Sequence, residues 1–126
     1  MGAQILVIED DVDLRAEVMD FLLRRLNTVR ACGTLAEAEE VLKAMRPDFV
    51  LSDINLPDGD GVSFCMLHAG NHRQAKWLLM SGNLELVRLS NTLKCVADTP
   101  PYTVVDKPVP LRLLDNFIHS WMMRTR

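Results

Sequence analysis

Acidic residues, a serine and a lysine follow four short apolar runs of the chain, in the order Glu9-Asp10-Asp11, Ser52-Asp53, Ser81 and Lys107. Carboxylates that gather in one crevice repel each other unless a cation lies among them. Lys107 would supply one positive charge, and Mg²⁺ could supply the rest because it prefers hard oxygen ligands. The residue types therefore indicate a magnesium site that is built mainly from carboxylates.

Each of these residues also has an ordinary structural interpretation. Asp11 or Asp13 could be the N-cap of a helix, and for either residue taken alone this is the better interpretation. Asp53 could belong to a turn and Ser81 to a loop. Lys107 could be a solvated charge at a strand end. Because water can satisfy a long lysine at such a position, we expect its loss to cost little stability and to affect mainly the response to phosphate. These interpretations weaken when the residues are taken together, since they leave three acids at one place without a counter-charge.

The elements that would bring these residues together are short apolar runs that alternate with helical patterns. Residues 5–8 form a continuous apolar run, which is typical of a strand covered on both faces. Four further strands are expected at residues 28–32, 49–51, 77–80 and 102–105. Helices are expected around residues 14–26, 38–45, 62–68, 84–96 and 111–121. Thr34 and Glu37 have the spacing of a capping box at the start of the second helix.

This alternation predicts an α/β fold with a doubly wound, five-stranded parallel sheet and five helices on its two faces. The 126 residues fit one compact domain, so a single domain over residues 1–126 is expected. In sheets of this kind, functional sites form just beyond the carboxyl ends of the strands. All four groups of polar residues fall at such strand ends.

Composition argues against several classes of protein. The net charge of −3 gives no basic surface for nucleic acid. No apolar run approaches the roughly 18 residues that suggest a membrane helix. Cys32, Cys65 and Cys95 are odd in number and far apart, which favours reduced thiols in a cytosolic compartment. We therefore expect a cytoplasmic protein that binds neither membranes nor nucleic acid directly.

The set Asp10-Asp11, Asp53, Ser81 and Lys107-Pro108, in which each group closes a different strand, resembles the receiver domains of two-component response regulators. The resemblance covers essentially the whole chain, in order and at near-usual spacing. It implies a CheY-like, flavodoxin-like sheet with strand order 2-1-3-4-5. It also implies a phosphoacceptor in a signalling relay rather than an enzyme with its own substrate.

The resemblance assigns a metal-binding role to four positions. Asp11 would bind Mg²⁺ directly, and Asp10 mainly through water. Asp53 and the backbone carbonyl of Asn55 would complete the protein ligands. All of these are oxygen ligands, as Mg²⁺ requires.

The resemblance also assigns the handling of the phosphoryl group. Asp53 would receive it from the phosphohistidine of a sensor histidine kinase or a histidine phosphotransfer protein. Ser81 would hydrogen-bond one phosphoryl oxygen and Lys107 would pair with another. Lys107-Pro108 resembles the cis peptide of the family, which is plausible before proline.

Two other functions compete with this interpretation. A phosphohydrolase that uses an aspartyl phosphate carries a second Asp two residues after the nucleophile, and Asn55 at that position cannot transfer protons. A receiver-like binding module that takes no phosphate is the other alternative, and the intact acids, serine and lysine argue against it. An unknown output partner is expected to respond through residues 83–101, because Val104 stands where receivers often carry a mobile aromatic side chain.

Overall fold

The computed structural model describes residues 2–82, 102–107 and 110–124, and its centre is a five-stranded parallel sheet. The strands lie in the order β2-β1-β3-β6-β7, and consecutive neighbours pair in parallel. Their bounds are β1 Gln4–Ile8, β2 Thr28–Cys32, β3 Phe49–Asp53, β6 Lys76–Ser81 and β7 Tyr102–Asp106. Counted along the chain without a small separate hairpin, this is the predicted order 2-1-3-4-5, which the structure confirms.

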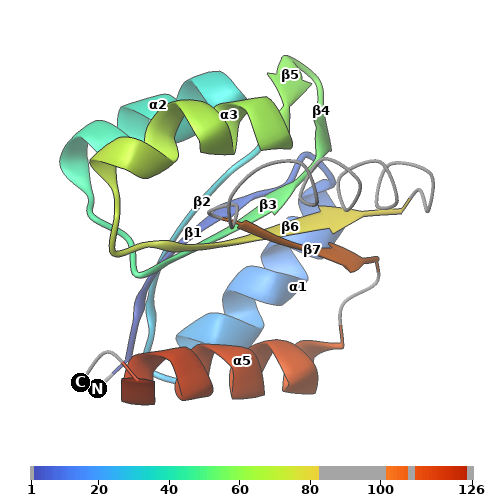
Figure 1. The fold of residues 1–126 in the computed structure, drawn as a ribbon. Coiled ribbons are helices and arrows are strands. Elements are labelled where there is room, and N and C mark those ends of the chain that lie inside the picture. The colour runs from blue at the N-terminus through green and yellow to red at the C-terminus, as the bar shows by residue number, and fades with distance from the viewer. Residues whose placement is uncertain (1, 83–101, 108–109, 125–126) are drawn as a thin grey trace.

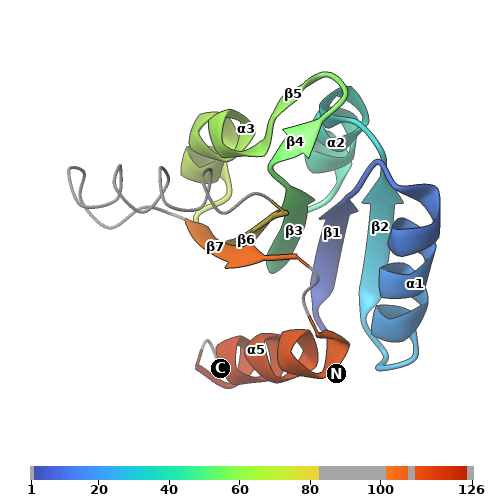
Figure 2. The same cartoon turned by 90° about the vertical axis from the view of Figure 1, so that its right-hand side faces the viewer.

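Helices cover both faces of the sheet, as Figure 1 shows, with α2 and α3 on one face and α1 and α5 on the other. In the view turned by 90°, α5 again lies below the sheet while α2 and α3 lie above it (Figure 2). The helices span α1 Val12–Leu23, α2 Leu35–Ala44, α3 Gly61–His68 and α5 Leu111–Arg124, and a 3₁₀ turn, η1 Ala69–Asn71, follows α3. The helix predicted around residues 84–96 lies outside the described residues.

The core consists of two layers, one on each face of the sheet. Alternate residues of a strand point to opposite faces, so Ile5 and Val7 pack towards α1 and α5 while Leu6 and Ile8 pack towards α2 and α3. All four side chains are at most 1% exposed. Because this strand is buried on both faces, its sequence is an unbroken run of apolar residues. Within the described residues, no helix is long and apolar enough to cross a membrane.

Side-chain caps fix where the helices begin. The Asp11 carboxylate accepts hydrogen bonds from the N–H groups of Asp13 and Leu14 at the start of α1, at 3.0 and 3.1 Å. The hydroxyl of Thr34 accepts from the N–H of Glu37 at 3.2 Å and donates to the Glu37 carboxylate at 3.0 Å. The predicted pairing of Thr34 with Glu37 is thus present, although the carboxylate accepts from the hydroxyl rather than from the backbone N–H.

A small hairpin, whose sequence has the glycine and aspartate content of a turn, follows the third strand. It pairs β4 Asn55–Leu56 with β5 Gly59–Asp60. At its tip, Asp58 accepts hydrogen bonds from the N–H groups of Leu35 and Ala36 at 2.8 and 3.0 Å, and these bonds lower the pKa of the Asp58 carboxyl. The hairpin is therefore tied to the first turn of α2, where helix N–H groups have no partner within the helix.

Candidate functional site

Three carboxylates meet beyond the carboxyl ends of β1 and β3, where the topology of the sheet predicts a site. Glu9, Asp10 and Asp53 each offer one oxygen, and these oxygens all lie within 4.8 Å of one another. Glu9 is 1% exposed and Asp53 is 8% exposed, whereas Asp10 is open to solvent. Three hard oxygen donors around one point, with an open side for water and phosphate oxygens, fit Mg²⁺.

Lys107 joins this cluster from the end of β7. Its Nζ donates a hydrogen bond to Oε1 of Glu9 at 2.7 Å and another to Oδ2 of Asp53 at 2.9 Å. The lysine side chain is only 22% exposed, so it is not the solvated strand-end charge of the structural interpretation. The ammonium group balances the negative charges of two buried carboxylates, which would repel each other without it.

The ionisation of Glu9 and Lys107 reflects both their burial and their contact. Burial raises the pKa of Glu9, and the hydrogen bonds from Lys107 and from the N–H of Asp11 only partly oppose this rise. Burial alone would lower the pKa of Lys107, but its bonds to Glu9 and Asp53 outweigh burial and raise the pKa. Lys107 is thus a permanent cation at neutral pH, and Glu9 is a carboxylate with an increased affinity for a proton.

In the structure, Asp11 has a role at the start of a helix. Its carboxylate is used as the N-cap of α1 and it does not belong to the group of carboxylates that could hold a metal. Glu9 belongs to this group, and its backbone continues the pairing with β2 for one residue beyond β1. The N–H of Glu9 still donates to the carbonyl of Cys32 at 2.9 Å. A sequence signal for Glu9 existed, since it is the first acid after the apolar run.

The other predicted residues lie near the same edge of the sheet. Ser81 ends β6, is 1% exposed, and its carbonyl accepts a hydrogen bond from the N–H of Lys107 at 2.9 Å. Asn55 begins β4, two residues after Asp53, and its side chain is exposed. Val104 packs against the core layer beneath α2 and α3. Pro108, and with it the predicted cis peptide, lies outside the described residues.

Gly61 holds the start of α3 close to the chain that follows Asp53, and no motif in the sequence marks this role. A Cβ at this position would collide with the carbonyl oxygen of Asp53. The N–H of Gly61 donates to the carbonyl of Ile54 at 2.7 Å, so the start of α3 lies directly against the chain after Asp53. Glycine is required here because only it lets the two backbones approach so closely.

Sequence comparison identifies the family. The sequence model of the response regulator receiver domain matches residues 5–119. The chain is 33% identical over 64 residues to the DNA-binding transcriptional activator DevR/DosR of Mycobacterium tuberculosis, which is 49% of this chain and 30% of that protein. It is 29% identical over 92 residues to the two-component response regulator ARR11 of Arabidopsis thaliana, which is 71% of this chain and 17% of that protein.

A solved structure of similar fold is a two-component response regulator from Clostridium difficile. It superimposes with a TM-score of 0.82 at 22% identity, and the match covers 99% of both chains. At this identity the likeness concerns the fold, while the sequence match over residues 5–119 establishes the family. The chain belongs to the response regulator receiver domain family of two-component signalling.

Proposed function

We propose that Asp53 accepts a phosphoryl group from the phosphohistidine of a sensor histidine kinase or a histidine phosphotransfer protein, with Mg²⁺ bound beside it. The observation that supports this proposal best is the cluster of Glu9, Asp10 and Asp53 closed by Lys107. Phosphoryl transfer asks a protein mainly for positioning and for neutralisation of charge. A carboxylate nucleophile between a lysine and a cation site meets both needs.

The reaction would form a bond between a carboxylate oxygen of Asp53 and phosphorus while the phosphorus–nitrogen bond of phosphohistidine breaks. The electron pair of that bond stays on the imidazole nitrogen, which then takes a proton. Lys107 would turn its ammonium from Asp53 towards a phosphoryl oxygen, and Ser81 would donate to another. Mg²⁺ would supply charge neutralisation for the remaining oxygens, held by Glu9, Asp10, Asp53 and the backbone carbonyl of Asn55.

The domain would act as a switch rather than as an enzyme with a separate substrate. Asn55, two residues after Asp53, cannot serve as the proton donor that a phosphohydrolase needs. The expected output segment, residues 83–101, lies outside the described residues, and an output partner that binds there remains part of the proposal. We also propose that residues 1–126 form one receiver domain that acts in the cytoplasm, where free thiols such as those of Cys32 and Cys65 persist.

Phosphorylation by a small donor tests the proposal. The protein is incubated with acetyl phosphate in Mg²⁺ or in EDTA, and its intact mass is measured at neutral pH. We expect the added mass of one phosphoryl group in Mg²⁺, little in EDTA, and its removal by hydroxylamine, which cleaves acyl phosphates. Absence of any addition in Mg²⁺ would favour a receiver-like module that takes no phosphate.

Neighbouring aspartates should differ sharply in their effect on Mg²⁺ affinity. Asp10→Asn removes a charge from the cluster, so we expect the dissociation constant for Mg²⁺ to rise by about tenfold or more, or at least ~1.4 kcal/mol. Asp11→Asn removes the same charge one residue later but keeps an effective N-cap, so its Mg²⁺ affinity should change much less. Titration followed by Trp77 fluorescence or amide shifts compares the two, and equal losses would restore Asp11 as a ligand.

A further inference from the structure

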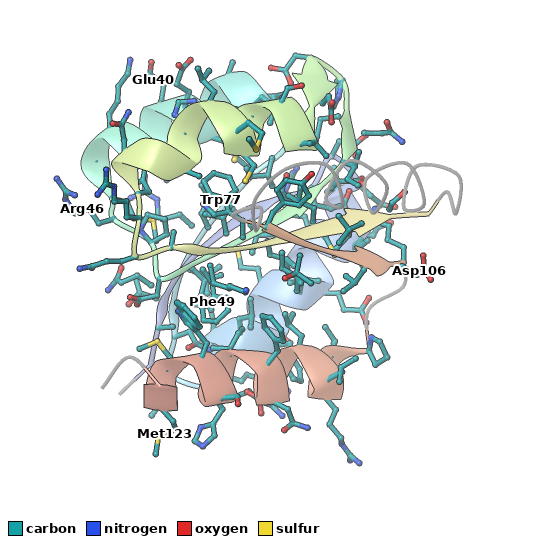
Figure 3. All side chains as sticks on the ribbon, in the orientation of Figure 1. Glu40, Arg46, Phe49, Trp77, Asp106 and Met123 are labelled. Carbon is teal, nitrogen blue, oxygen red and sulfur yellow. The ribbon has the colours of Figure 1, made fainter. Side chains whose placement is uncertain are left out.

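A basic surface cavity lies at the opposite end of the sheet from the carboxylate cluster. Its volume is about 440 Å³, and its lining comes from residues 46–48, before β3, and residues 70–75, before β6. Figure 3 shows Arg46 of this lining on one side of the molecule and Asp106, at the carboxyl end of β7, on the other. The cavity is therefore separate from the site proposed for phosphorylation.

Two guanidinium groups in this cavity have no acidic partner among the residues that the structure describes. Arg46 and Arg73 are exposed, and within the described part of the chain neither forms an ion pair, whereas Arg24 pairs with Asp20 at 3.1 Å. One carboxylate, that of Asp48, also lines the cavity. It accepts a hydrogen bond from the N–H of Gln4 at 2.8 Å, which directs it towards β1.

A second, smaller cavity continues the basic surface. It has a volume of about 270 Å³, shares Arg46, Asn71 and His72 with the first cavity, and adds Lys43. Burial lowers the pKa of His72, and electrostatic interactions with His68 and Arg46 lower it further. Arg46 thus interacts electrostatically with His72, as expected for two groups that line the same cavity.

The turn before β6 adds uncharged donors to the same lining. The carbonyl of His72 accepts from the N–H of Ala75 at 3.0 Å, which closes the turn. Across the described ranges, the N–H groups of Arg73 and Gln74 donate to no protein acceptor. Gly70 leaves open space beside the turn, since a Cβ there would meet no atom within 4 Å.

We propose that this cavity binds a small ligand that carries phosphate groups. Planar guanidinium groups donate paired hydrogen bonds to phosphate oxygens, and Arg46 and Arg73 are free to do so. The amide side chains of Asn71 and Gln74 and the free N–H groups of the turn add neutral donors. The volume exceeds that of a single phosphate ion, so a diphosphate group, or a phosphate with an attached organic part, matches the space better.

Pyrophosphate in EDTA is the probe, because without Mg²⁺ the carboxylate cluster at the other end of the sheet repels anions. Amide chemical shifts are followed during the titration. We expect saturable shifts centred on Arg46 and residues 71–75, and a dissociation constant that rises about tenfold or more in Arg46→Gln and in Arg73→Gln. Arg30→Gln is the matched control, since Arg30 is an exposed arginine on β2 that lines neither cavity.

Four results would contradict the proposal. Shifts that grow linearly without saturation would show weak general attraction. An equal loss of affinity in Arg30→Gln would show that net charge rather than the cavity decides binding. Shifts confined to the surroundings of Glu9 and Asp53 would move the site to the other end of the sheet. Arg46→Lys, which keeps the charge and removes the planar fork, should still weaken binding, and unchanged affinity in that variant would exclude the role given to the guanidinium.

Discussion

Replacing Asp53 by alanine is expected to abolish formation of the acyl phosphate completely. Asp53 is the acid of the cluster that ends the central strand β3, and its Oδ2 lies 2.9 Å from Nζ of Lys107. A nucleophile must meet phosphorus with its own oxygen, so no neighbour can replace it without a change in geometry. The measurement is intact mass after incubation with acetyl phosphate and Mg²⁺, followed by peptide mapping.

Loss of the label in this variant should not reflect unfolding. Removal of Asp53 relieves the repulsion that this carboxylate exerts on Glu9, and Lys107 keeps its bond to Glu9 at 2.7 Å. Asp106→Ala is the matched control, because Asp106 ends β7 at the same edge of the sheet but is exposed and outside the cluster. The control should label as the parent protein does. A phosphoryl label that persists in Asp53→Ala would contradict the assignment. If peptide mapping then located the label on Asp10, that residue would be the acceptor.

The main features of the sheet could be predicted from the sequence because strands that are buried on both faces have unbroken apolar sequences. Residues 5–8 and 49–51 are apolar without interruption, and both lie in the middle of the sheet. The β4–β5 hairpin has no comparable sequence pattern. Its strands have two residues each, and Asp58 holds it to α2 across more than twenty positions of sequence. Contacts of this kind depend on the assembled fold rather than on local pattern.

At the end of the first strand, the sequence places the acids at the right edge of the sheet but does not say which of them face the cluster. Glu9, Asp10 and Asp11 are consecutive acids, and a shift of one residue decides which of them face the cluster and which caps the helix. The preference of aspartate for the N-cap position pointed to the right role for Asp11. The resemblance to the family pointed to Asp10 and Asp11 as metal ligands, and the structure shows that the local preference prevailed at Asp11.

The loss of Lys107 is expected to destabilise the domain, contrary to what its position at a strand end suggested. Lys107→Met keeps most of the apolar stem and removes the charge, which leaves the buried Glu9 carboxylate without its cation. Removal of one partner from a buried ion pair typically costs 3–5 kcal/mol, and partial exposure of Lys107 with uptake of a proton by Glu9 reduces this to about 1–3 kcal/mol. Urea unfolding in EDTA at pH 7.5 measures the difference.

The pH dependence of this loss identifies Glu9 as its cause. The folded-state pKa of Lys107 is raised, so its contribution in the parent protein is complete below its unfolded pKa of about 10.5 and is lost only as the pH rises through the higher folded value. The folded-state pKa of Glu9 is also raised, so folding takes up a proton and stability increases as the pH falls through that value towards 4.5. Without Lys107 the pKa of Glu9 rises further, so Glu9 takes up its proton at a higher pH in the variant. The loss of unfolding free energy in Lys107→Met, relative to the parent protein, should therefore become smaller from pH 8 to pH 5.

A comparison with Lys43 separates this effect from the general loss of a lysine. Lys43 pairs with Glu40 at 2.9 Å, but both side chains are about two-thirds exposed or more. Exposed pairs contribute little, so Lys43→Met should unfold like the parent protein at every pH. In Lys107→Met/Glu9→Gln, which has no buried carboxylate left to protonate at position 9, the pH dependence of the deficit should largely disappear. If that double variant keeps the full pH dependence, another acid is responsible, and Asp53 is the first to examine because it is the second partner of Lys107.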